Sequence, residues 1–118
     1  MNRVSLILFA IAALAGVAMA VRHFRAKLLP RPVVSAIHGL FAASGLVVLL
    51  LALIKVGFGG TSGIALGFFL VAALGGFALL SFHLRGRPLP SGLVVGHGLL
   101  AVAGFVLLLA AEYAQTSG

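Results

Sequence analysis

Four long apolar runs, separated by short polar or glycine-containing breaks, dominate the chain. They cover approximately residues 4–21, 33–54, 61–82 and 91–111. Each is close to the length of about 20 residues that an α-helix needs to cross the hydrocarbon core of a bilayer. The pattern therefore predicts an all-α integral membrane protein, with four transmembrane helices in one domain over residues 1–118. Because the runs are apolar on all sides, they do not predict which helix face points inward.

The breaks contain residues that end or start helices. A Pro-x-Pro sequence follows the first run and another follows the third, and glycines follow the second; these residues are Pro30, Pro32, Pro88, Pro90, Gly57, Gly59 and Gly60. Proline cannot continue a helix but suits the first turn of the next, and glycine allows a tight turn. Connections this short make consecutive helices neighbours, so the four spans should form a bundle.

The second half of the chain repeats the first. The matching blocks are 12–18 with 72–78, at an offset of 60, and 38–45 with 97–104, at an offset of 59. This predicts two tandem helical hairpins, with repeat 1 over about 4–54 and repeat 2 over about 61–113. Each repeat has an even number of spans, so both enter the membrane in the same sense. The repeat should therefore be parallel, with a pseudo-two-fold axis along the membrane normal.

Composition excludes a water-soluble domain and most catalytic chemistry. The chain is 63% hydrophobic and 8% charged, with a mean hydropathy of +1.31. It has no cysteine and a single acidic residue, Glu112. Paired carboxylates, thiol nucleophiles and a Ser-His-Asp arrangement are therefore impossible, and the chain is predicted not to be an enzyme.

The basic residues predict the orientation. Six of the eight lie in the first and third connections, whereas Arg3 and Lys55 lie toward the other side. The positive-inside rule then places these connections in the cytoplasm and both termini outside, in a cytoplasmic (inner) membrane. Since the basic residues lie close to the spans, the net charge of +7 indicates contact with anionic lipid headgroups and not with nucleic acid.

The N-terminal run also resembles a secretory signal. Arg3, the apolar run and the Ala18-Met19-Ala20 sequence would provide its charged start, its core and its cleavage site. The repeat, however, continues through this point to His23, and the basic cluster after the run opposes translocation. We therefore interpret the run as the first transmembrane helix.

All four histidines lie in the repeat, and two of them, His38 and His97, fall inside spans at equivalent positions. Each is about five residues into its predicted helix, roughly 8 Å below the interface. If they face inward, they point toward each other across the axis. Gly45 and Gly104 follow seven residues later on the same helix face. Ionisable residues within spans are rare and are candidates for function.

Two explanations of the histidines stay open. In the first, small residues allow close helix packing and the histidines donate interhelical hydrogen bonds. In the second, His38 and His97 are the axial ligands of a haem b, glycine leaves room for the macrocycle, and Arg25 and Arg85 pair with the propionates. A site for a metal ion alone would also need His23 and His83, which lie about a turn and a half away and have no carboxylate near them.

These observations predict a small membrane-embedded subunit of an electron-transfer or energy-transducing complex. Its partners would be the lipid bilayer, other membrane subunits or further copies of itself, and a quinone as redox partner. The first alternative is a haem-free accessory subunit that stabilises a larger membrane complex. The second is a small transporter or channel, against which the almost wholly apolar core argues.

Overall fold

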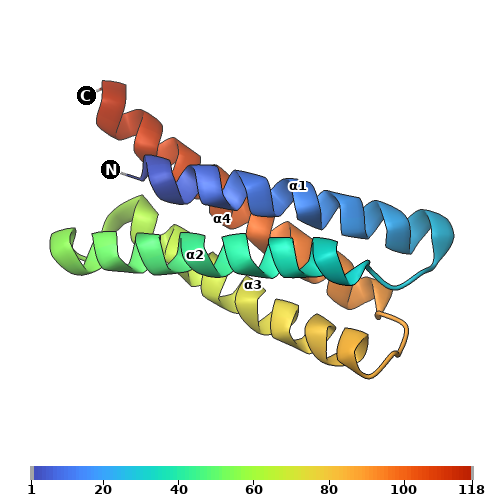
Figure 1. The fold of residues 1–118 in the computed structure, drawn as a ribbon. Helices are drawn as coiled ribbons and strands as arrows, with labels where there is room; N and C mark the ends of the chain where they lie inside the picture. Colours follow the sequence, from blue (N-terminus) through green and yellow to red (C-terminus); the bar gives the residue numbers. More distant parts are fainter. Residues whose placement is uncertain (1, 118) are drawn as a thin grey trace.

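Residues 2–117 are described by the computed structural model, which is all-helical over that range apart from short connections (Figure 1). Its four helices are α1 (Arg3–Ala26), α2 (Pro32–Val56), α3 (Gly60–Leu84) and α4 (Ser91–Ser117). All four are long and apolar enough to cross a membrane. The prediction of an all-α chain with four long apolar helices is confirmed, and these helices are compatible with a four-helix membrane protein.

The helices extend beyond the apolar runs that predicted them. The largest differences are at the ends of α1 and α4, which continue to Ala26 and Ser117. Arg25 and His23 occupy the last turn of α1, where positive side chains interact favourably with the helix dipole. Lys27 then ends α1 in the left-handed conformation, at φ 54°, and its N–H donates to the carbonyl oxygen of His23.

The helices pair as hairpins. α1 packs along α2 and α3 along α4, while α1 also touches α4 and α2 touches α3. α1 is therefore diagonal to α3, and α2 is diagonal to α4. The two termini and the α2–α3 turn lie at one end of the bundle (Figure 1). The connections 27–31 and 85–90 lie at the other, which we call the basic end.

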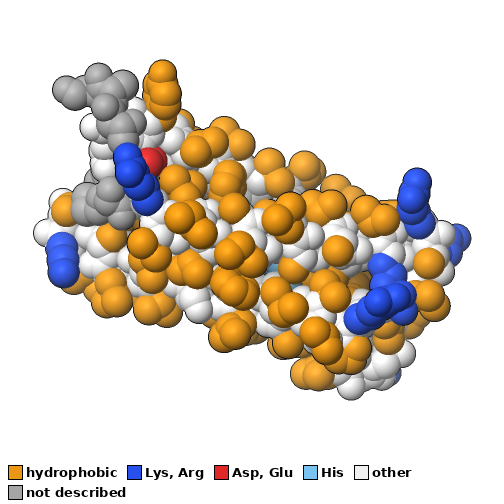
Figure 2. All heavy atoms as spheres, turned by 45° about the horizontal axis from the view of Figure 1, so that its top comes forward, with side chains coloured by type: hydrophobic (Ala, Val, Ile, Leu, Met, Phe, Trp, Pro, Cys, Tyr) orange, Lys and Arg blue, Asp and Glu red, His pale blue; other side chains and the backbone are white. Residues whose placement is uncertain are grey.

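On the face of the bundle that Figure 2 shows, apolar side chains cover the surface between the two ends. Leu14 and Leu74 are 74% and 69% exposed although they lie in the middle of their helices. On the same face, Lys and Arg side chains lie only at the two ends (Figure 2). An apolar band bounded by charges is the surface expected of a protein whose solvent is lipid.

The buried core lies in the half of the bundle near the termini. Phe9 and Phe69 meet across the α1–α3 diagonal as a parallel stack, with ring centroids 4.0 Å apart and an angle of 9° between the rings. Leu49 and Leu108 are fully buried in the same cluster. Both pairs are related by the offsets of the sequence repeat, 60 and 59 respectively.

A polar cluster closes the bundle at the end that holds the termini. The backbone N–H of Asn2 donates to Oε2 of Glu112 at 3.0 Å, and the Asn2 side-chain amide donates to Oγ of Ser62 at 3.0 Å. Arg3 Nε lies 3.4 Å from Oε1 of Glu112. The only acid of the chain therefore ties the start of α1 to α4 and is itself buried.

Replacing Glu112 with alanine should destabilise the fold by about 1–3 kcal/mol, because it removes the acceptor of a buried backbone N–H. Glu112→Gln keeps an acceptor oxygen and should cost less. The SDS concentration at half-unfolding, followed by far-UV circular dichroism of the detergent-solubilised protein, measures both. An alanine variant as stable as the wild type would contradict a stabilising role for the cluster.

Candidate functional site

His38 on α2 and His97 on α4 face each other in the interior. Their ring centroids are 5.9 Å apart and their planes are inclined at 77°. Because α2 and α4 are diagonal helices, the two imidazoles span the centre of the bundle. Each lies about two turns into its helix from the basic end. Both side chains therefore point into the bundle. The sequence could not predict this direction, because the helices are apolar on all sides.

A backbone carbonyl on the neighbouring helix of the same hairpin orients each imidazole. Nδ1 of His38 lies 2.7 Å from the carbonyl oxygen of Ala12, and Nδ1 of His97 lies 2.7 Å from that of Ala72. A carbonyl only accepts, so Nδ1 carries the proton in both rings. In the neutral imidazole Nε2 is then the unprotonated nitrogen, with its lone pair available.

Glycines allow the imidazoles to lie directly on the neighbouring helices. A Cβ atom at Gly16 of α1 would lie 3.1 Å from Cε1 of His38, and one at Gly76 of α3 would lie 3.1 Å from Cε1 of His97. An added Cβ at either glycine would require the imidazole to shift by a few tenths of an ångström. The sequence shows these glycines seven residues before His23 and His83, but only the register of the hairpins shows that they contact the other two histidines.

The glycines predicted beside the histidines have other neighbours. A Cβ at Gly45 would lie 3.0 Å from the ring of Phe9, and one at Gly104 would lie 3.2 Å from the ring of Phe69. Gly45 and Gly104 therefore accommodate the phenyl stack, which is the next layer of the interior away from the basic end. Two imidazole and two phenyl rings thus pack against four glycines: Gly16, Gly45, Gly76 and Gly104.

The two arginines predicted to contact propionates lie at the basic end. Arg85 is exposed, and it donates from Nε and Nη2 to the carbonyl oxygen and Oγ of Ser81, at 3.1 and 2.9 Å. Its guanidinium also lies 5.0 Å from the ring centroid of Phe82. Arg25 is exposed and lines a hollow between α1 and α2. Within residues 2–117 no hydrogen bond joins either arginine to the histidine pair.

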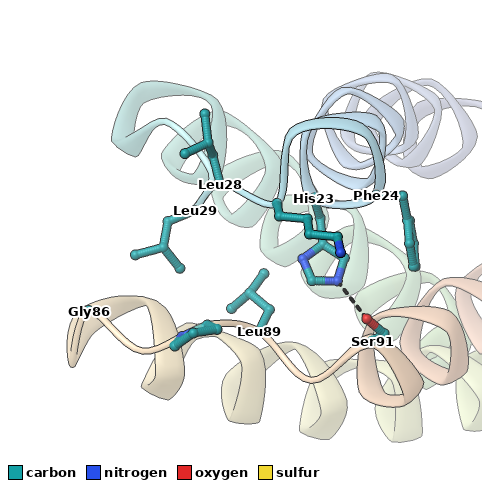
Figure 3. A pocket seen from close by; sticks show the side chains of 9 residues that line it. His23, Phe24, Leu28, Leu29, Gly86, Leu89 and Ser91 are labelled. Carbon is teal, nitrogen blue, oxygen red and sulfur yellow. Dashed lines mark hydrogen bonds between the residues drawn. The ribbon is translucent and has the colours of Figure 1, made fainter.

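The remaining histidines are separate from the pair. Nε2 of His23 lies 3.0 Å from Oγ of Ser91, which joins the end of α1 to the start of α4 (Figure 3). These residues and Lys27 border a hollow of about 350 Å³ between the two connections of the basic end. In the other repeat, the position equivalent to Ser91 is Pro32, the first residue of α2. Proline has no hydroxyl group, so His83 cannot make the equivalent contact. Across the described part of the chain, no three metal-binding side chains come together.

Comparison with protein-family models, with curated proteins and with solved structures gives no match. The arrangement offers two inward-facing imidazoles, each with Nδ1 on a backbone carbonyl, and among the described residues no hydrogen bond is made at Nε2 and no carboxylate lies beside the rings.

Proposed function

We propose that the chain is a membrane-embedded electron-transfer subunit that holds a haem b between His38 and His97. The supporting observation is the carbonyl-anchored pair across the α2–α4 diagonal. Histidines that bind a metal generally donate their other ring N–H to a carbonyl or carboxylate, which orients the ligating nitrogen. Both imidazoles have this hydrogen bond, so His38 and His97 would hold the haem iron through Nε2.

The spacing of the rings agrees with this role. With metal–nitrogen bonds of about 2 Å, two imidazoles on opposite sides of one metal atom have centroids roughly 6 Å apart. The observed separation is 5.9 Å. Ala12, Gly16, Ala72 and Gly76 are the small residues that flank the pair on α1 and α3. The two imidazoles fill the space that Gly16 and Gly76 leave.

The histidine pair would restrict the chemistry to one-electron transfer. Held by both His38 and His97, the group would supply one-electron transfer and not oxygen activation. The residues of the chain would bind and orient the group and would exclude water from it. The electron would be exchanged with a quinone, another membrane subunit or a further copy of the chain.

We further propose that the fold is a duplicated hairpin with a pseudo-two-fold axis along the membrane normal. The contact between His38 and Ala12 recurs between His97 and Ala72, which supports this. The two histidines are 59 residues apart and the two alanines are 60 residues apart. The charge asymmetry supports an orientation with the basic end in the cytoplasm and both termini outside.

The orientation predicts the location of reporters. A reporter that works only outside the cytoplasm, such as alkaline phosphatase, should be active when fused after Gly118. A reporter that works only inside, such as green fluorescent protein, should be active when inserted in the connection between Arg25 and Arg31. The pair of alkaline phosphatase and green fluorescent protein distinguishes the two sides. The reverse pattern would invert the orientation and move the histidine pair toward the outer face.

A haem-free structural subunit is the second candidate, and the packing of the rings supports it. The imidazoles lie against Gly16 and Gly76, and the stack of Phe9 and Phe69 fills the next layer. An interior closed in this way needs no cofactor to hold the hairpins together. The haem content of protein isolated from its native membrane, measured as the pyridine haemochrome, separates the candidates. A stoichiometric amount supports the electron-transfer subunit, and none supports the structural one.

A further inference from the structure

Three arginines of repeat 1 line one hollow on the outside of the hairpin α1–α2. Arg22 and Arg25 come from the end of α1, and Arg31 immediately precedes α2. The hollow has a volume of about 380 Å³, within the range of roughly 300–1,000 Å³ typical of small-molecule sites. The rest of its lining is apolar and includes Ala18 and Val34. This hollow is distinct from the histidine pair and from the hollow beside His23.

The charge of the hollow is not compensated by the protein. The only acidic residue of the chain, Glu112, is bonded to Asn2 at the opposite end of the bundle. Arg22 is held in place because its Nε donates to the carbonyl oxygen of Leu29 at 2.7 Å, while Arg25 and Arg31 are exposed. Like charges gathered at one place repel each other, so an anion bound among them would stabilise the arrangement. Guanidinium groups match phosphate oxygens in a bidentate geometry.

An exposed apolar strip leads away from the hollow along α1. Val21 lines the hollow, and Val17 and Leu14 follow it on the same helix face at intervals of four and three residues. Their exposed fractions rise from 45% to 61% and 74% along the strip. A ligand with a phosphate at the arginines and an apolar chain along this strip would cover both features.

We propose that the hollow formed by Arg22, Arg25 and Arg31 binds the headgroup of one anionic phospholipid, whose acyl chain lies along α1. A lipid with a single negative charge, such as phosphatidylglycerol, fits the arginines. Phosphatidylcholine also has a phosphate, but it would bring a cation into a cationic hollow. Inorganic phosphate would satisfy the arginines but would leave the strip uncovered.

The repeat supplies the matched control. The positions in repeat 2 that correspond to Arg22, Arg25 and Arg31 are Phe82, Arg85 and Pro90. Only one arginine is therefore kept, and it donates to Ser81 of its own helix. Removing two positive charges from repeat 2 lowers the net charge at the same end of the bundle without changing the hollow.

Native mass spectrometry of the full chain in detergent, titrated with phosphatidylglycerol or phosphatidylcholine, tests the proposal. The wild type should retain one phosphatidylglycerol, bound roughly tenfold more tightly than phosphatidylcholine. The double variant Arg25→Gln/Arg31→Gln should lose this preference, and Arg85→Gln/Arg87→Gln should keep it. Equal losses in the two double variants would show a general charge effect and overturn the proposal, as would equal binding of both lipids by the wild type.

Two further measurements complete the test. Displacement of the lipid by millimolar inorganic phosphate would show a phosphate site and overturn the assignment to a lipid. Far-UV circular dichroism shows whether each variant stays helical. If Arg25→Gln/Arg31→Gln does not fold, the single variant Arg31→Gln in the exposed connection makes the same comparison with Arg87→Gln. None of these outcomes depends on whether the histidine pair holds haem.

Discussion

His38→Ala and His97→Ala are each expected to abolish haem binding while the protein still inserts into the membrane. Each substitution removes one of the two side chains that would hold the iron, and the remaining imidazole supplies only one ligand nitrogen. The purified variants should contain no low-spin haem held by two histidines. The measurement is the amount of haem per chain. A variant with its full haem content would eliminate that histidine as a ligand.

His83→Ala is the matched control for these two variants. His83 lies at the end of α3, and its imidazole, unlike that of His23, forms no hydrogen bond to another described side chain or carbonyl. Its removal should leave the haem content unchanged. If all three alanine variants lost haem equally, the effect would be a general one on folding and would say nothing about ligation.

Phe9→Ala should cause the largest loss of stability among single substitutions in the core. Phe9 is 6% exposed, stacks on Phe69 at 4.0 Å and fills the space left by Gly45. Truncating a buried phenylalanine in a water-soluble protein costs about 3–5 kcal/mol, part of which is transfer from water. Lipid is as apolar as the core, so only the packing part is lost here, and we expect about 1–3 kcal/mol.

Phe77→Ala is the control for this substitution. Phe77 lies on α3 and is 69% exposed on the apolar surface of the bundle. Its truncation should change stability by less than about 0.5 kcal/mol. SDS-induced unfolding of both variants measures the difference. Equal stability of Phe9→Ala and the wild type would show that the phenyl stack does not hold the hairpins together.

The helices could be predicted from the sequence because hydropathy and helix breakers act locally. Pro32 starts α2, and Gly57 and Gly60 adopt positive φ angles of 100° and 79° at the turn before α3. The helix ends were predicted less well. α1 continues past the apolar run to Ala26. Long polar side chains such as that of Arg22 can stay within a helix while their polar groups reach the end of the bundle.

The interior contacts could not be predicted, because they depend on how distant helices pack. Helices that are apolar on every side give no signal for the face on which His38 lies. The roles of Gly16 and Gly45 depend on the register between α1 and α2, which brings one against an imidazole and the other against a phenyl ring. The bond from Asn2 to Glu112 joins residues 110 positions apart and has no local pattern.

A visible absorption spectrum of the detergent-solubilised protein from its native membrane, oxidised and then reduced with dithionite, tests the central claim most directly. The proposed axial pair of His38 and His97 predicts a Soret band and, on reduction, the sharp α and β bands of a low-spin haem b. A spectrum without these bands would contradict the electron-transfer function. The histidine pair would then be a packing element of a structural subunit.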